Sequence, residues 1–210
     1  MSRPLTPAEK DSIQKHLALL GRLLDCYRDC LKVADDDPWL RELRGEVTDL
    51  AALLADGKID IEIQKPSIGG ETDRKGIHLN PDFGYSLPPD WELENCGDGY
   101  HTSFWKLTAV LMHEHDHWKH DIGLEGFFRR LVGVLLLPVW GPLNYLYGHR
   151  NPFPHERRAY QRAYLLLGSW KHVLEMIKIA GCECFPCVDA NLQAVEFERV
   201  RQNPRSDLGG

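Results

Sequence analysis

The chain has 210 residues, enough for one domain of ordinary size to bury a hydrophobic core without disulfide support. With 43% hydrophobic and 27% charged residues, the composition excludes collagen-like, low-complexity and wholly disordered chains. The formal net charge of -6 argues against nucleic acid as the partner, because binding to a phosphate backbone needs clustered Lys and Arg.

The first 57 residues predict a helical hairpin. Thr6 and Glu9 match a capping box with Pro7 at the first helical position, and apolar residues follow at steps of three and four. A second stripe with the same steps covers residues 40–54 after an Asp-rich turn. Two stripes joined by a short loop predict antiparallel helices, which either pack on the rest of the chain or dock a partner.

Short strands and further helices follow the hairpin. Residues 59–63 alternate between apolar and polar with period two, and residues 77–79 give a weaker signal of the same kind. Helices are expected over residues 102–120, 122–137 and 152–181.

Residues 131–148 carry no charged side chain, and this uncharged segment is nearly as long as a membrane span. Pro138, Gly141 and Pro142 interrupt the segment and would leave backbone groups that lipid cannot satisfy, so we do not expect a span. A buried helix followed by an apolar turn is the favoured interpretation. Peripheral contact with a membrane or a partner is the alternative.

The segment His113-Glu114-x-x-His117 has the spacing of a zinc site. Residues four apart lie on one face of a helix, so both imidazoles can reach one Zn²⁺ ion. Glu114 lies beside the first ligand, where it can take a proton from water whose pKa the ion lowers. The same helix carries a stripe expected to be buried: Phe104, Thr108 and Leu111.

Other polar residues of this helix are weaker ligand candidates. His120 shares the face of His113 but lies about 10 Å along the axis, too far for both rings to bind one ion. His115 and Asp116 point to other faces, where they either support the ligands or lie at the surface.

Glu156 is the favoured third ligand, because a catalytic zinc takes three protein ligands and leaves one position for water. Asn151 resembles a helix N-cap, which places Glu156 in the opening turns of a long helix. Ala159 and Ala163 share its face and are small enough for close helix packing. The reserve ligands are His149, His155 and Glu175.

These residues resemble the gluzincin branch of the zincin metallopeptidases. The HExxH segment is followed, 39 residues after His117, by Glu156 in the setting Asn-Pro-Phe-x-x-Glu-x-x-Ala-Tyr. The resemblance covers residues 104–165 and implies that the two histidines and Glu156 bind zinc, with Glu114 as general base. The metzincin pattern does not fit, since it requires Gly at position 120 and His at position 123.

The resemblance also implies a sheet that binds an extended peptide. Few strands precede the HExxH helix, so this sheet must be small, with residues 59–63 or 77–79 as its candidate edge. A group that stabilises the oxyanion is expected near the third ligand, and several side chains there qualify. They are Tyr147, His149, His155, Tyr160 and Tyr164.

The cysteines leave three interpretations open. Cys182-x-Cys184-x-x-Cys187 has thiolate spacing for Zn²⁺, and Cys26 and Cys30 lie one helical turn apart and could complete the site. Unligated thiols and disulfides are the alternatives. The first residues form no signal peptide, so we expect the cytoplasm, although an effector exported without a signal peptide would have the same features.

We therefore expect a mainly helical α+β fold. It would consist of a hairpin over residues 1–57 packed on a zincin-like catalytic domain with a small sheet over residues 58–200. Residues 201–210 would form a mobile tail.

The expected function is zinc-dependent hydrolysis of peptide bonds in a protein or peptide substrate. His113, His117 and Glu156 would hold Zn²⁺, and Glu114 would activate water and pass its proton to the leaving amine. One alternative is a non-catalytic, partner-binding protein stabilised by zinc. Another is a hydrolase that cuts a different bond, because the metal chemistry alone does not specify the substrate.

Overall fold

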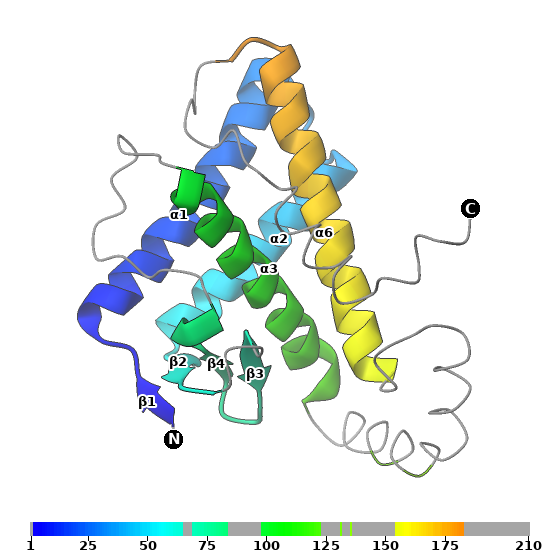
Figure 1. The fold of residues 1–210 in the computed structure, drawn as a ribbon. Coiled ribbons are helices and arrows are strands. Elements are labelled where there is room, and N and C mark those ends of the chain that lie inside the picture. Colours follow the sequence, from blue (N-terminus) through cyan, green and yellow to red (C-terminus); the bar gives the residue numbers. More distant parts are fainter. Residues whose placement is uncertain are drawn as a thin grey trace.

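Four long helices and a small sheet make up the described part of the chain (Figure 1). The computed structural model describes residues 2–64, 69–83, 98–122, 131, 135 and 154–182. The helices are α1 (Pro7–Leu31), α2 (Pro38–Ala55), α3 (Asp98–Asp121) and α6 (Pro154–Ile179). The mainly helical α+β class expected from the sequence is confirmed.

The ends of the N-terminal helices are set by local sequence. Thr6 Oγ1 accepts a hydrogen bond from the Glu9 amide at 3.2 Å, and the Glu9 carboxylate accepts one from the Thr6 amide at 2.8 Å. Lys32 ends α1 in the left-handed conformation with φ 53°. Asp37 caps α2 by accepting from the Leu40 amide at 3.0 Å. The predicted hairpin is confirmed.

The sheet lies at one end of the helices, with the strand order β1-β2-β4-β3. Its strands are β1 (Ser2–Pro4), β2 (Ile59–Glu62), β3 (Gly70–Thr72) and β4 (Ile77–Leu79). The predicted strands β2 and β4 pair in parallel at the centre of this sheet, so the prediction that one of them offers an edge is wrong. The outer strands β1 (Ser-Arg-Pro) and β3 (Gly-Glu-Thr) contain no Val, Ile, Leu or aromatic residue, so they show no alternation of the kind seen in β4.

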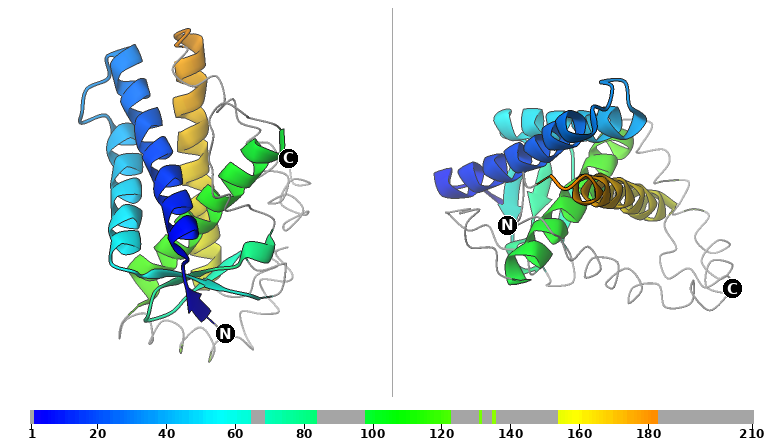
Figure 2. Two further views of the ribbon diagram at one scale, coloured as in Figure 1. Left: turned by 90° about the vertical axis from the view of Figure 1, so that its left-hand side faces the viewer. Right: turned by 90° about the horizontal axis from the view of Figure 1, so that it is seen from above.

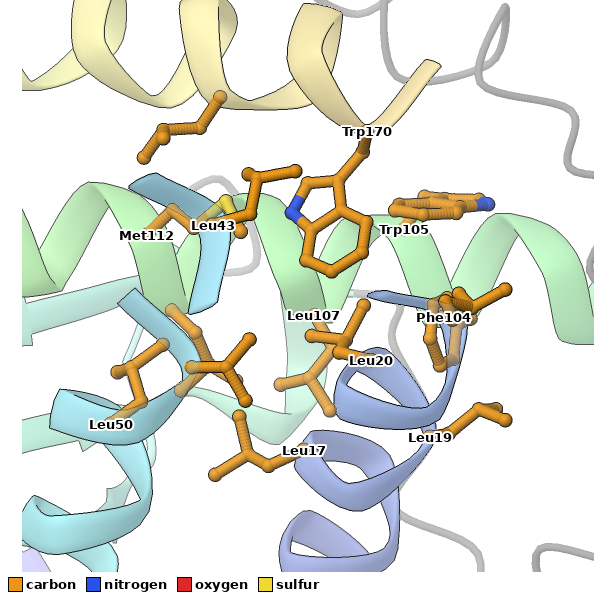
Figure 3. Close-up of a cluster of buried hydrophobic side chains, with 14 of the residues drawn as sticks. Leu17, Leu19, Leu20, Leu43, Leu50, Phe104, Trp105, Leu107, Met112 and Trp170 are labelled. Carbon is orange, nitrogen blue, oxygen red and sulfur yellow. The ribbon is translucent and has the colours of Figure 1, made fainter. Parts of the chain in front are cut away.

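One hydrophobic core joins the hairpin to the other helices. In Figure 2, α1, α2 and α6 run side by side and α3 crosses them obliquely, in agreement with their contacts. Figure 3 shows Trp170 of α6 and Trp105 of α3 packed over leucines of α1 and α2. Both indole rings are fully buried, with centroids 6.2 Å apart. The apolar stripes of the hairpin therefore lie in the core that seats α3.

The buried carboxylate of Glu46 on α2 contacts side chains of α3 and α6. Glu46 Oε2 lies 2.5 Å from Nδ1 of His115, and its other oxygen lies 3.3 Å from both Lys119 and Arg162. His115 is therefore buried in a helix contact, away from the surface.

Three cysteines lie together near the C-terminal end of α1. Cys30 forms a disulfide with Cys182, which follows α6, and Sγ of Cys26 lies 3.7 Å from Sγ of Cys30. Cys184 and Cys187 lie outside the described residues.

Only two positions of the apolar segment 131–148 are described. Leu131 and Leu135 are helical and are 42% and 68% exposed, so the core interpretation is wrong for these two residues. The other positions of the segment lie outside the described residues. Among the helices that are described, none is long and apolar enough to cross a membrane.

His16 gives the fold a pH dependence. Its ring is fully buried on α1, and Nε2 donates to Oγ1 of Thr108 at 3.0 Å, since that hydroxyl itself donates to the Phe104 carbonyl. Burial lowers the pKa of His16 to about 3, whereas the unfolded chain has the ordinary value of about 6.5. The unfolded chain therefore takes up a proton first, and stability falls as the pH drops from about 6.5 towards 3.

Between pH 7 and pH 5, the free energy of unfolding should fall by about 2 kcal/mol more in the wild-type protein than in His16→Gln. The reason is that glutamine keeps a hydrogen-bond donor but does not titrate. Urea unfolding at both pH values measures this difference. Between pH 7 and pH 8 the two proteins should change alike, because His16 is neutral in both states there. An equal loss in both proteins between pH 7 and pH 5 would contradict the assignment.

Candidate metal centre

Helix α3 places two imidazoles on one face. Nε2 of His113 and Nε2 of His117 lie 3.2 Å apart, one turn along the helix. The helix is anchored from its other side by Phe104, Thr108 and Leu111, each at most 1% exposed, as the sequence predicted. The rigid seat of α3 therefore fixes the direction in which both rings point.

Helix α6 supplies the third donor. The two carboxylate oxygens of Glu156 lie 3.5 Å from Nε2 of His113 and 3.5 Å from Nε2 of His117. Ala159 and Ala163 are buried where α6 packs on α3, so the two helices approach closely enough for a short carboxylate to reach. The three predicted ligands are brought together, with donor atoms within 4.8 Å of one another.

The spacing of these atoms fits a tetrahedral ion. Bonds of about 2.0 to 2.1 Å from zinc to N and O ligands make the edges of the tetrahedron about 3.3 Å long. The separations found, 3.2, 3.5 and 3.5 Å, are close to that edge length. Two imidazoles and one carboxylate are also the donor set that catalytic zinc takes.

The ring of His117 is held in a ligand orientation. Its Nδ1 donates to Oδ2 of Asp121 at 2.6 Å, because a carboxylate can only accept, and this leaves Nε2 directed at the site. The same oxygen accepts from Arg158 at 3.1 Å, and Arg158 also donates to Asp116 at 2.8 Å. This arginine therefore attaches the start of α6 to α3 beside the ligands.

Charges in the site shift the pKa values of two ligands. Burial would lower the pKa of His117, but its hydrogen bonds to Glu156 and Asp121 raise it to about 9. Burial would raise the pKa of Glu156, but its contacts with His113 and His117 hold it well below its usual range. Glu156 is therefore an anion at neutral pH.

Glu114 is buried beside the ligands and is not one of them. Its Oε1 lies 4.0 Å from Nε2 of His113, while Oε2 accepts from Thr72 Oγ1 at 2.8 Å. Burial raises the pKa of this carboxyl group, against the opposing charges of the two histidines. Among the described residues, none donates a hydrogen bond to Oε1.

Strand β3 passes directly against Glu114. A Cβ atom on Gly70 would lie 3.0 Å from Cγ of Glu114 and 3.1 Å from the His78 carbonyl oxygen. The lack of a side chain at this position lets the outer strand approach α3. The structure therefore places a strand edge beside the site, although it is β3 and not the predicted β2 or β4.

Two aromatic side chains flank the ligands. The ring of Tyr160 lies against His113 with centroids 4.4 Å apart, and the ring of His155 lies 5.9 Å from that of His117. Tyr160 is 48% exposed. Burial of the hydroxyl and the charges of Glu156 and Glu114 raise its pKa, so the phenol keeps its proton.

The remaining candidates fall outside this group. Ring atom Nδ1 of His120 turns to the backbone and side chain of Asp116. Glu175 is exposed and lies about 28 Å along α6 from Glu156. His149 and Asn151 lie outside the described residues.

Three residues of the site were missed in the sequence: Thr72, Asp121 and Arg158. Asp121 follows His117 by four positions, which is a usable signal, because a carboxylate one turn on can accept from the ligand ring. Thr72 and Arg158 act across the tertiary contacts of β3 and α6 with α3, which no local pattern shows.

Comparisons with known proteins add no relative. No protein-family model, no curated protein and no solved structure matches the chain.

Proposed function

We propose that the chain is a zinc-dependent peptidase with a small zincin-like fold. The observation that carries this proposal is the set of donor atoms from His113, His117 and Glu156 at tetrahedral spacing, with Oε1 of the buried Glu114 lying 4.0 Å from Nε2 of His113. A structural zinc site is closed by four protein ligands, whereas three ligands next to a buried base are typical of a hydrolytic site.

Each residue then has a defined task. When bound, Zn²⁺ supplies a Lewis acid that lowers the pKa of water and polarises a carbonyl group. Glu114 takes a proton from the attacking water through Oε1 and later gives it to the leaving amine. Thr72 holds the other oxygen of Glu114, so the base keeps one orientation through both transfers.

The outer strand β3 supports a peptide as the substrate. Among the described residues, its three residues pair along one edge with β4, and Thr72 and Gly70 contact Glu114. A peptide added to the other edge would run past the general base with its backbone held by strand hydrogen bonds. This geometry favours a peptide bond over other bonds that activated water could cut.

Tyr160 is the favoured donor to the oxyanion that forms when water attacks. Its ring contacts a ligand histidine, and its phenol stays protonated next to the two carboxylates. We expect Tyr160→Phe to lower kcat on the order of 100-fold, as for loss of one oxyanion donor, with KM and zinc content nearly unchanged. Steady-state kinetics together with metal analysis measures this split.

Tyr164→Phe is the matched control, because Tyr164 lies one turn further along α6 and is also partly exposed. That variant should keep its kcat. If both variants retain activity, the oxyanion donor is another group, and His155 beside His117 is the next to test.

The function itself is tested with the full chain and a mixed peptide library. Protein stripped of metal should not cut, and protein reloaded with zinc should produce new peptide N-termini that mass spectrometry identifies. Glu114→Gln loaded with zinc should produce none. Tight zinc binding without any cleavage would favour the non-catalytic partner-binding alternative.

A further inference from the structure

A group of cysteine side chains lies at the opposite end of α6 from Glu156. Cys26 and Cys30 occupy the last two turns of α1, one turn apart on the same face. Cys182 comes directly after Gly181, whose φ of 67° turns the chain at the end of α6. Cys30 is bonded to Cys182, and Sγ of Cys26 lies 3.7 Å from Sγ of Cys30. Two sulfur atoms of α1 and one from the residue that follows α6 therefore lie close together, with Cys30 in contact with both of the others.

We infer that Cys26, Cys30 and Cys182 are ligands of a second metal site, which takes a thiophilic divalent ion such as Zn²⁺ when the thiols are reduced. Zinc–sulfur bonds of about 2.3 Å make the edge of a tetrahedral site about 3.8 Å long, and the two α1 sulfurs lie 3.7 Å apart. A disulfide uses two of these sulfurs, whereas an ion binds all three. The Cys30–Cys182 disulfide is the oxidised state of the same site.

The change between the two states is a dithiol exchange. A dithiol reductant breaks the Cys30–Cys182 bond, gives two electrons and two protons to the two sulfurs, and leaves as its own disulfide. The three thiols then release their protons as they bind the ion. Oxidation by a disulfide runs the sequence backwards and expels the ion.

This site is separate from the proposed hydrolytic centre and does not rest on the proposed function. From Glu156 to Ile179, α6 extends about 35 Å, so no ligand can serve both ions. Either state joins the end of α1 to the end of α6, where the two helices already pack.

The test uses the full chain with His113→Ala and His117→Ala, which removes two of the three proposed hydrolytic ligands. Reduced, zinc-loaded protein should keep about one zinc per chain, and adding Cys182→Ser should bring this close to zero. The control is Cys96→Ser, which should keep the zinc. A reduced double variant without zinc, or zinc retained after Cys182→Ser, would overturn the inference.

A second measurement avoids the cysteine variants in case they unfold. Reduced wild-type protein loaded with Co²⁺ should show a thiolate-to-cobalt charge-transfer band, and zinc should slow alkylation of Cys26, Cys30 and Cys182 relative to Cys96. Mild oxidation should abolish the band and produce a linked Cys30–Cys182 peptide. Absence of the band, or equal alkylation of Cys26 with and without zinc, would contradict a shared site.

Discussion

Glu114→Gln should lower kcat for peptide hydrolysis by roughly 100- to 10,000-fold while the protein keeps its zinc, because this is the range that a positioned general base contributes. The amide has the shape of the carboxylate and can still accept from Thr72, but it cannot take a proton from water. The measurement is kcat and bound zinc on the same preparation, with KM compared to show that substrate binding survives.

A carboxylate on the neighbouring strand provides the control for this experiment. Glu71→Gln removes an exposed charge on β3 without touching the base, and it should retain nearly all of the activity. If Glu114→Gln were as active as the wild type, the peptidase proposal would fail, since the other described carboxylates at the cluster already have roles: Glu156 is a proposed ligand, and Asp121 accepts from Nδ1 of His117.

Glu156→Ala should lose activity for a different reason, because this variant should lose the bound metal. Two imidazoles alone bind zinc far more weakly than three ligands. Removal of a hydrogen bond that supports a ligand lowers zinc affinity roughly 10- to 100-fold, and we expect Glu156→Ala to lower it by more than that. Activity should fall with the zinc content, and excess zinc should restore part of it. Competition with a chelator of known affinity measures the change.

Glu175→Ala is the matched control on the same helix, because this residue is exposed and distant from the site. It should keep both zinc and activity. Full zinc content in Glu156→Ala at low free metal would show that the third ligand is elsewhere, and His155, 3.7 Å from the Glu156 carboxylate, would be examined next.

The sequence predicted those features that a short stretch of chain determines. The hairpin follows from apolar steps of three and four together with the Thr6 cap, and β2 follows from alternation around Ile61. Strands β1 and β3 contain no Val, Ile, Leu or aromatic residue to show a period, and β1 pairs with β2, which lies far along the chain. The edge next to the site was therefore assigned to the wrong strand.

In the candidate site, too, the sequence predicted the local features and missed those that depend on tertiary contacts. His113, Glu114 and His117 belong to one helix, and their relation follows from its pitch. Glu156 was found from its place in the opening turns of a helix, from the small residues Ala159 and Ala163 on its face, and from the resemblance to gluzincins. Thr72 and Arg158 reach the site through strand and helix packing. When a side chain on one element orients a side chain on another, the pair leaves no spacing pattern in the sequence.

Because Glu156 and Arg158 lie in the first two turns of α6, docking of this helix and assembly of the ligand set are one event. Any fluctuation that lifts this end from α3 breaks both at once, so a bound ion adds its binding free energy to the cost of that local opening. At a free ion concentration 100 times Kd, the addition is about 2.7 kcal/mol, and amide hydrogen exchange that occurs through this opening slows about 100-fold. Exchange in the middle of α1 does not depend on this opening. If the proposed site binds its ion, metal loading sets the local stability of one end of α6, with the remainder of the fold already held by its core.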